Sequence, residues 1–203
     1  PRPVDFHLKG LEKLGAKVTL RSGYILAEAK KLMGANINFE FPSVGATGNI
    51  VMAAATADGI TTIENAAREP EIVQLCDYLN KMGASISGIG TSKIVIEGVE
   101  SLYPANIEVI PDRIEAGTFL MAGALMGKIT LNEINPEHLY AVLQKLKEVG
   151  ALVETTSNSV TIEPGDLKPV DMRTAVYPGF ATDLQAQWVA LMSLADGSSM
   201  VTD

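Results

Sequence analysis

A phrase of a leucine, three further residues, a glycine and an alanine occurs three times in this chain. The glycines of the phrase are Gly15, Gly83 and Gly150, which are 68 and 67 residues apart. Such regular spacing predicts a chain built from repeated units. Each unit leaves apolar faces on its helices and strands, so it needs neighbouring units to cover them. The phrase occupies residues 11–16, 79–84 and 146–151.

Each phrase predicts the end of an amphipathic helix, because apolar residues lie three or four apart before it and a glycine stops the helix in a left-handed conformation. A hairpin of two strands is expected next, then a second helix and a last strand. The fold class is therefore α/β (α+β), with pseudo-symmetric repeats of helix, strand, strand, helix and strand. The second helices are expected over 45–57, 114–126 and 182–195, and the last strands over 61–64, 128–131 and 200–202.

Small side chains are concentrated in two of these second helices, at residues 53–55 and 121–124. They indicate helices that pack very closely, since small side chains let two backbones approach. Helix propensity alone explains the alanines equally well, so both interpretations stay open.

Composition excludes several classes of protein. The chain has 203 residues, of which 47% are hydrophobic and 20% charged, which is typical of a folded domain. A net charge of -8 argues against a nucleic-acid partner. No stretch reaches the roughly 20 apolar residues that span a bilayer, and the first residues lack a signal-peptide core. We therefore expect no membrane partner and a cytoplasmic location.

Cysteine and histidine are too few for a metal centre. Cys76 is the single cysteine, which excludes an intrachain disulfide, and it lies between Leu75 and Leu79 in a position typical of a helix core. His7 and His138 share no ligand spacing. No metal site is expected.

Two segments combine residue types that can bind an anion or a nucleotide. Residues 2–6 place the Arg2 guanidinium and the Asp5 carboxylate around Pro3. Residues 43–49 form a loop of small residues that opens a helix, where unsatisfied backbone N–H groups can receive a phosphate. Taken alone, the first segment can be a surface turn, and Ser43 can simply cap the helix.

Two further segments carry carboxylates at helix starts. Residues 65–71 have a proline with acidic neighbours, which is ordinary chemistry for the first turn of a helix. Residues 177–185 contain a Pro-Gly turn that delivers Thr182 and Asp183 to a helix start. Asp183 can be a cap or a general base, and as a base it needs a raised pKa.

Together these segments closely resemble the UDP-N-acetylglucosamine enolpyruvyl transferases, the 1-carboxyvinyltransferases of peptidoglycan synthesis. The resemblance runs through the whole chain. Its motifs are residues 2–5, 42–47, 64–71, 110–118 and 177–187.

The resemblance implies a two-domain, inside-out α/β barrel with three pseudo-symmetric units in each domain. By that comparison residues 1–110 are the latter part of the first domain, and residues 111–203 are the opening part of the second. Substrate is expected in the cleft between the two domains.

The resemblance also implies the reaction. The enolpyruvyl group of phosphoenolpyruvate is transferred to the 3-hydroxyl of UDP-N-acetylglucosamine with release of phosphate, and no cofactor is expected. Asp183 matches the residue proposed as the base that contacts the sugar hydroxyl. Arg2 matches an arginine near the phosphate of phosphoenolpyruvate, where a forked guanidinium suits two oxygens. Substrate-binding positions that the match adds are Pro3, Val4, Asp5 and Phe6 for uridine, and Ser43, Val44 and Gly45 for the diphosphate.

The sequence departs from the family pattern in three places. The family's reactive cysteine belongs to a loop before Arg2, and Cys76 cannot replace it. Phe6 stands where leucine is more usual, and Phe41 stands where some members have a lysine that contacts uridine. Because other family phosphate ligands also lie outside the 203 residues, we expect little or no turnover from this chain alone, and exposed repeat ends make self-association possible.

Two other functions remain open. A shikimate-pathway enolpyruvyl transferase shares the fold and the phosphoenolpyruvate donor. A non-catalytic binding or structural module can also retain the fold.

Overall fold

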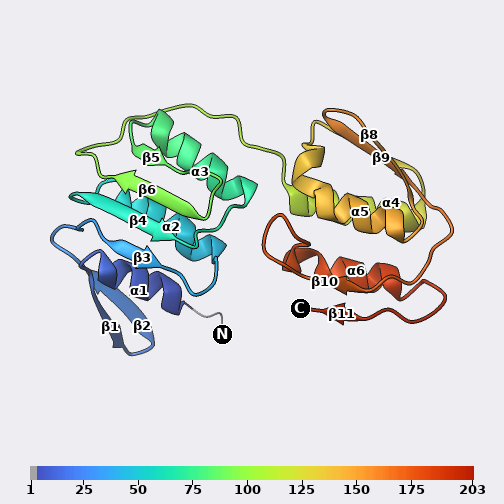
Figure 1. Cartoon of the computed structure of the whole chain (residues 1–203), viewed down its shortest axis with the longest axis horizontal. Helices are drawn as coiled ribbons and strands as arrows, with labels where there is room; N and C mark the ends of the chain where they lie inside the picture. The colour runs from blue at the N-terminus through green and yellow to red at the C-terminus, as the bar shows by residue number, and fades with distance from the viewer. Residues whose placement is uncertain (1–3) are drawn as a thin grey trace. The chain divides into compact units, whose positions relative to one another are not determined.

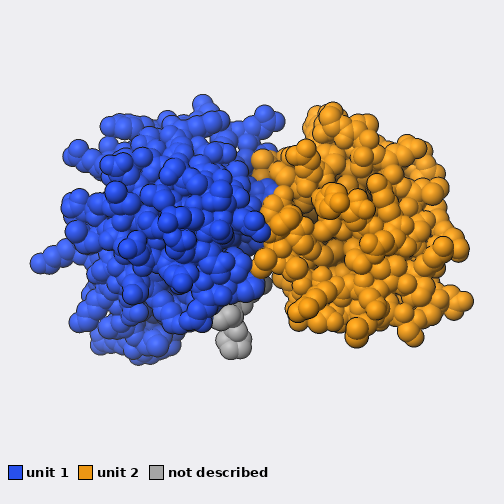
Figure 2. Space-filling model, in the orientation of Figure 1, with its two compact units in different colours: residues 1–109 blue, residues 110–203 orange. Residues whose placement is uncertain are grey.

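A computed structural model describes residues 4–203 of the chain (Figure 1). The chain divides into two compact units, residues 1–109 and residues 110–203 (Figure 2). Each unit has its own hydrophobic core and is described by itself. The assignment of residues 1–110 and 111–203 to the two domains of the family stays a prediction.

Unit 1 is built around a four-stranded sheet with the strand order β3-β4-β6-β5 (Figure 1). β3 runs parallel to β4, and the other neighbours are antiparallel. A separate hairpin, β1-β2, follows the first helix. The helices are α1 Asp5–Lys13, α2 Val44–Ala54 and α3 Pro70–Lys81, and the strands are β1 Lys17–Arg21, β2 Tyr24–Glu28, β3 Asn36–Asn38, β4 Ile60–Glu64, β5 Ser85–Ser87 and β6 Lys93–Glu97.

Unit 2 repeats this plan with a three-stranded antiparallel sheet, β7-β9-β8, and a short parallel pair, β10-β11. The helices are α4 Arg113–Met126, α5 Tyr140–Glu148 and α6 Gln185–Met192, with 3-10 turns η1 Pro136–Leu139 and η2 Thr182–Leu184. The strands are β7 Ile129–Asn132, β8 Leu152–Thr155, β9 Ser159–Glu163, β10 Met172–Arg173 and β11 Val201–Thr202.

The three glycine phrases end the helices α1, α3 and α5, as the repeats predict. Gly15, Gly83 and Gly150 have φ values of 94°, 101° and 103°. In each phrase the alanine N–H donates to the leucine carbonyl that begins the phrase, over 3.0, 3.0 and 3.1 Å. This is the hydrogen bond of a Schellman helix end, and only glycine adopts its left-handed conformation without a steric cost.

The predicted order of elements is incomplete. The structure adds β3 before α2 and β10 before α6, each paired in parallel with the last strand of its repeat. Each added strand has one buried apolar residue, Ile37 in β3 and Met172 in β10. A strand is recognised in a sequence by alternating apolar and polar residues, and one apolar residue makes no such pattern. The predicted helix 182–195 is also divided, because η2 precedes α6.

Two glycines of the second helices differ in how closely they are packed. Gly123 of α4 faces β7 and β9, where a Cβ would come within 2.5 Å of Ile162 Cγ2 and 3.2 Å of Ile129 Cβ. Gly48 of α2 has more room, since a Cβ there would lie 3.4 Å from Leu75 Cδ2, an ordinary contact. Close packing therefore requires glycine at Gly123 and does not require it at Gly48.

The helices of residues 4–203 include none that is long and apolar enough to cross a bilayer.

The two helix glycines give opposite expectations for stability. Gly123→Ala is expected to lower the free energy of unfolding by about 1–3 kcal/mol, because the added methyl overpacks the core. Gly48→Ala is expected to raise it by up to about 1 kcal/mol, because alanine favours the helix. Urea unfolding of both variants measures the difference. Equal effects would show that helix propensity alone explains the small residues.

Candidate functional site

The N-terminal binding segment is partly described. Arg2 and Pro3 lie outside the described residues. Val4 is the N-cap position of α1, with 42% of its surface exposed, and its carbonyl accepts a hydrogen bond from the N–H of Leu8 over 3.1 Å. Asp5 is the first residue of α1, where the helix dipole stabilises a negative charge. One of its carboxylate oxygens lies 3.8 Å from Lys9 Nζ.

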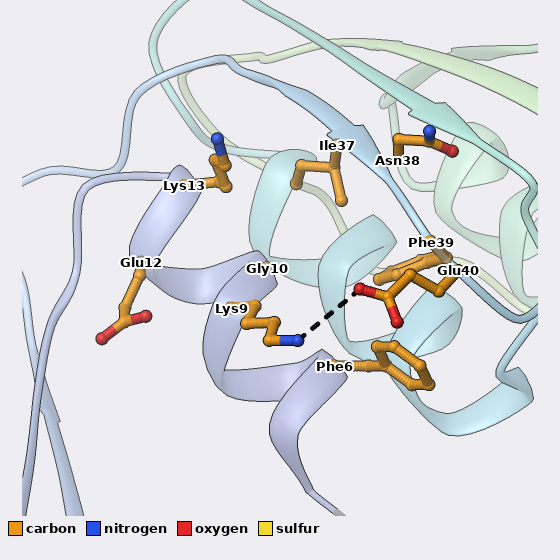
Figure 3. A pocket seen from close by; sticks show the side chains of 9 residues that line it. All are labelled: Phe6, Lys9, Gly10, Glu12, Lys13, Ile37, Asn38, Phe39 and Glu40. Atoms are coloured by element: carbon orange, nitrogen blue, oxygen red, sulfur yellow. Dashed lines mark ion pairs between the residues drawn. The ribbon is translucent and has the colours of Figure 1, made fainter.

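Phe6 lies on the next turn and borders a pocket of about 410 Å³ between α1 and β3 (Figure 3). Its ring meets the edge of Phe39 with 6.1 Å between centroids, and the Lys9 ammonium lies 5.8 Å from the Phe6 centroid. Lys9 also faces Glu40 across the pocket at 3.9 Å. The pocket thus combines an aromatic wall with a charged rim.

The loop before α2 is a capped helix start. The Ser43 hydroxyl accepts a hydrogen bond from the N–H of Ala46 over 3.3 Å. The capping interpretation of Ser43 is therefore correct. The cap uses the N–H of Ala46. Val44 and Gly45 come before Ala46 in the first turn of α2, where backbone N–H groups have no acceptor within the helix.

A contact between α1 and α2 brings these two segments together. The side chains of His7 and Asn49 are hydrogen bonded, with 2.7 Å between Asn49 Nδ2 and His7 Nδ1. The His7 ring lies against Gly45, where a Cβ would come within 3.3 Å of Nε2. Residues 4–6 and the start of α2 therefore belong to one surface of unit 1.

The segment 65–71 is fastened to the same surface. The Asn65 side chain donates to the Phe39 carbonyl over 2.9 Å, and Asn65 itself has a φ of 56°. The N–H of Ala67 donates to the hydroxyl of Thr47, a fully buried residue of α2, over 3.1 Å. Thr47 thus joins the start of α2 to the segment that carries Arg68 and Glu69.

Glu69 is a buried acidic residue at the start of α3. It precedes Pro70, the first residue of α3, in agreement with the helix-start interpretation of this segment. Its side chain is only 6% exposed, and one carboxylate oxygen has no hydrogen-bond partner among the described residues. Burying a carboxylate oxygen without a hydrogen-bond donor costs folding free energy. The start of α3 therefore carries a carboxylate oxygen that can still accept a hydrogen bond.

Asp183 belongs to unit 2 and is exposed on η2. The turn before it follows a cis Tyr177–Pro178 bond, and the N–H of Ala175 donates to the carbonyl of Phe180 over 2.9 Å. Buried Phe180 and Leu184 anchor the turn on both sides of Asp183. The cap positions of η2 and α6 are Ala181 and Leu184, so Asp183 is not an N-cap residue.

The motif at residues 110–118 packs against the motif at residues 177–187. The Arg113 guanidinium lies 5.6 Å from the centre of the Tyr177 ring. The Gln187 side chain donates to the Thr118 hydroxyl over 3.0 Å, although the two residues are 69 positions apart. Two motifs that are distant in sequence therefore form one surface of unit 2.

Cys76 is buried and chemically quiet. Desolvation by burial, with a smaller effect of the Asp77 charge, raises the pKa of its thiol to about 11. A thiol that stays protonated at neutral pH is a poor nucleophile. This agrees with the core position predicted from the sequence.

Spacing alone did not predict the contacts that assemble the unit 1 surface. His7 and Asn49 are 42 positions apart, and no periodicity relates them. The one sequence signal of these contacts was Thr47, a polar residue among apolar and small residues at the start of a helix. Phe41 is 56% exposed.

Comparison with known proteins decides the family. The model of the family described as EPSP synthase (3-phosphoshikimate 1-carboxyvinyltransferase) matches residues 1–203. The chain belongs to this family. Curated relatives with a more specific name are also similar to it over its full length.

A UDP-N-acetylglucosamine 1-carboxyvinyltransferase from Chloroherpeton thalassium is 53% identical over 207 residues, which cover 100% of this chain and 48% of the relative. The protein of that name from Desulfosudis oleivorans is 52% identical, with 100% of this chain and 49% of the relative covered. The resemblance seen in the sequence is confirmed. The chain spans about half the length of these relatives.

Two solved structures share the fold. The enolpyruvyl transferase NikO from Streptomyces tendae matches with a TM-score of 0.83 and 24% identity, over 98% of this chain and 52% of that one. EPSP synthase from Acinetobacter baumannii matches with a TM-score of 0.67 and 21% identity, over 98% and 48% of the two chains. The predicted α/β fold class is therefore confirmed.

The Thr47 hydroxyl is expected to stabilise unit 1. Thr47→Val keeps the shape of the side chain and leaves the buried N–H of Ala67 without an acceptor, so it should cost about 1–3 kcal/mol of unfolding free energy. Thr47→Ser is the matched control, because it retains the hydroxyl. Urea unfolding followed by circular dichroism measures both. A serine variant less stable than the valine variant would contradict the role of the hydrogen bond.

Proposed function

We propose that this chain forms part of a UDP-N-acetylglucosamine 1-carboxyvinyltransferase. The enzyme transfers the enolpyruvyl group of phosphoenolpyruvate to the 3-hydroxyl of UDP-N-acetylglucosamine and releases phosphate, in peptidoglycan synthesis. The observation that carries this proposal is 53% identity, over the full chain, to a relative of that name. The chain spans about half of that relative, so the whole activity belongs to a polypeptide that contains this sequence.

The surface of unit 1 supports a role in nucleotide binding. The start of α1 and the first turn of α2 lie together, joined by His7 and Asn49. We assign the diphosphate to Ser43, Val44 and Gly45, because a helix N-terminus attracts an anion without a basic side chain. The N–H groups of Val44 and Gly45 are the donors, since the N–H of Ser43 already donates to the carbonyl of Phe41 over 2.8 Å. That arrangement suits a chain with a net charge of -8.

The uridine is assigned to residues 3–6 at the start of α1. The Phe6 ring offers an apolar face for a base. By the resemblance, exposed Phe41 stands where some members have a lysine that contacts uridine, so this chain is expected to lack that one contact.

Chemistry at the sugar hydroxyl is assigned to Asp183. Its carboxylate takes the proton of the 3-hydroxyl while the oxygen forms a bond to C2 of phosphoenolpyruvate, and C3 gains a proton from an acid outside this chain. Loss of a proton from C3 and of phosphate from C2 then restores the double bond. Arg2 is assigned to the phosphate of phosphoenolpyruvate.

This addition and elimination leaves the oxidation state of the substrates unchanged, so we propose no redox cofactor. With one cysteine and two histidines that share no ligand spacing, we also propose no metal. Both substrates are small anions of the cell interior, and we propose a cytoplasmic location.

The family description favours one alternative, 3-phosphoshikimate as the acceptor. Calorimetric titration of a complete enzyme carrying this sequence separates the two acceptors. Heat of binding is expected with UDP-N-acetylglucosamine and none with 3-phosphoshikimate, because the uridine and diphosphate positions match the nucleotide-sugar enzymes. A preference for 3-phosphoshikimate would reject the proposal, and failure to release phosphate from phosphoenolpyruvate would favour a non-catalytic module.

Asp183→Asn in that enzyme is expected to reduce turnover by at least about 10²-fold, the scale of a lost acid–base group, while the fold stays intact. Phosphate release measures turnover, and circular dichroism checks the fold. Asp166→Asn is the control, because it removes an equal charge from another exposed aspartate of unit 2. Near-normal turnover of Asp183→Asn would remove this residue from the mechanism.

A further inference from the structure

His7 lies between the two segments that the proposed function assigns to the nucleotide sugar. It follows Phe6 in α1, and its ring lies against Gly45 and is hydrogen bonded to Asn49. Gly45 and Asn49 are four positions apart in α2, so they lie on the same face of that helix. The imidazole therefore spans the first turn of α2 and the turn after it.

Gly45 makes room for the His7 ring. A Cβ at Gly45 would lie 3.2 Å from Cε1 and 3.3 Å from Nε2 of His7, closer than an ordinary contact. Gly45 is not one of the glycines with a positive φ, so its backbone conformation alone would accept alanine. The contact that a larger residue would disturb here is the one with the His7 ring.

The hydrogen bond to Asn49 defines the state of the imidazole. Asn49 Nδ2 lies 2.7 Å from His7 Nδ1, and an amide nitrogen can only donate. Nδ1 is therefore the acceptor, and the ring hydrogen is on Nε2. An imidazolium has hydrogens on both ring nitrogens, so it could not accept this bond.

A second contact, further along the two helices, fixes where they cross. A Cβ at Gly10 would come within 2.5 Å of Ile50 Cδ1, so α1 and α2 are in close contact there. Gly10 is three residues after His7, about 4.5 Å along the helix axis. One close contact lets a helix pivot about it, whereas two contacts at different heights fix its orientation. The bond between His7 and Asn49 provides the second contact.

Charged side chains do not provide this second contact. The helix α2, Val44–Ala54, contains no charged residue. On α1, Asp5 and Lys9 lie 3.8 Å from each other, and Lys9 also lies 3.9 Å from Glu40. The polar contact between α1 and α2 is therefore a hydrogen bond and not an ion pair.

A nucleotide that bridges the two segments requires them at one separation. The uridine is assigned to residues 3–6, immediately before His7, and the diphosphate is assigned to the first turn of α2, which contains Gly45. A site that already has the geometry of the complex loses less free energy to ordering when the ligand binds. The contact between His7 and Asn49 is therefore expected to favour binding of the nucleotide sugar.

We propose that His7 is a positioning residue for the nucleotide sugar. Its neutral ring, with the hydrogen on Nε2 and with Nδ1 bound to Asn49, holds the uridine segment of α1 beside the diphosphate turn of α2. The inference rests on the proposed function and adds a residue to the nucleotide site of that function. His7 acts through Asn49 and the orientation of α1, and the chemistry at the sugar hydroxyl stays with Asp183.

Kinetics of a complete enzyme carrying this sequence test the role. His7→Phe keeps a flat ring over Gly45 and removes the acceptor, whereas His7→Gln keeps an acceptor for the Asn49 amide. KM for UDP-N-acetylglucosamine is expected to rise about 3- to 10-fold in His7→Phe, since one hydrogen bond at the surface is lost. Both kcat and KM for phosphoenolpyruvate should stay within about 2-fold, because binding alone is affected. His7→Gln should recover most of the loss.

A double-mutant cycle separates positioning from a general loss of stability. Asn49→Ala is expected to raise the same KM by a similar factor, and the variant with both His7→Phe and Asn49→Ala should be no worse than either single variant. Circular dichroism checks that each variant is folded. Effects that multiply in the double variant would overturn the proposal, and so would an unchanged KM in His7→Phe.

Nitrogen NMR of the unmodified enzyme reports the imidazole tautomer directly. The hydrogen of the His7 ring is expected on Nε2, and a hydrogen on Nδ1 would overturn the positioning role even if the nucleotide sugar binds. Calorimetry distinguishes this failure from failure of the proposed function. If the unmodified enzyme binds UDP-N-acetylglucosamine and His7→Phe binds it equally well, only the role of His7 is rejected. If the unmodified enzyme does not bind the nucleotide sugar, the proposed function is rejected together with this inference.

Discussion

The fold depends on three glycine-ended helices. At Gly15, Gly83 and Gly150 the chain leaves a helix in a left-handed conformation, and the next alanine N–H returns to the helix to satisfy a carbonyl. This turn sets the direction in which each hairpin departs, and therefore which face of the hairpin meets the helix. A residue with a Cβ would meet a steric cost at each of these positions. The repeated architecture follows from one backbone conformation used three times.

The candidate site is built on the same plan at a different point of the repeat. In unit 1, the strands β3 and β4 run parallel, and the segments that leave their carboxyl ends contain the α2 start and residues 65–71. Thr47 and Asn65 tie those segments together with hydrogen bonds to backbone groups. Binding groups at the ends of parallel strands are a common arrangement in α/β proteins, because loops there are free to vary while the sheet stays fixed.

Much of this could be predicted from the sequence, because helix periodicity and glycine stops are local signals. The helices α1, α3 and α5 and their hairpins follow directly from the three phrases. The segments of Ser43 and Asp183 were singled out as helix starts from the residues alone, and their substrate roles came from the resemblance and remain proposals. The helix-cap alternative was correct for Ser43, whereas Asp183 occupies a first turn and caps neither η2 nor α6.

Other features could not be predicted because their causes are not local. β3 and β10 are two or three residues long, and each is a strand only because a parallel neighbour completes its hydrogen bonds. The contact between His7 and Asn49 joins residues 42 positions apart through the packing of α1 on α2. No period or spacing in the sequence carries that information.

The separate cores of the two units have an evolutionary consequence. The buried cluster around Ile50, Ile63 and Ile94 shares no member with the cluster around Leu120, Ile162 and Trp188. A mutation that loosens one cluster leaves the side-chain packing of the other unchanged. Selection can therefore adjust the cores of unit 1 and unit 2 separately, with compensating changes confined to the unit in which the first change occurred.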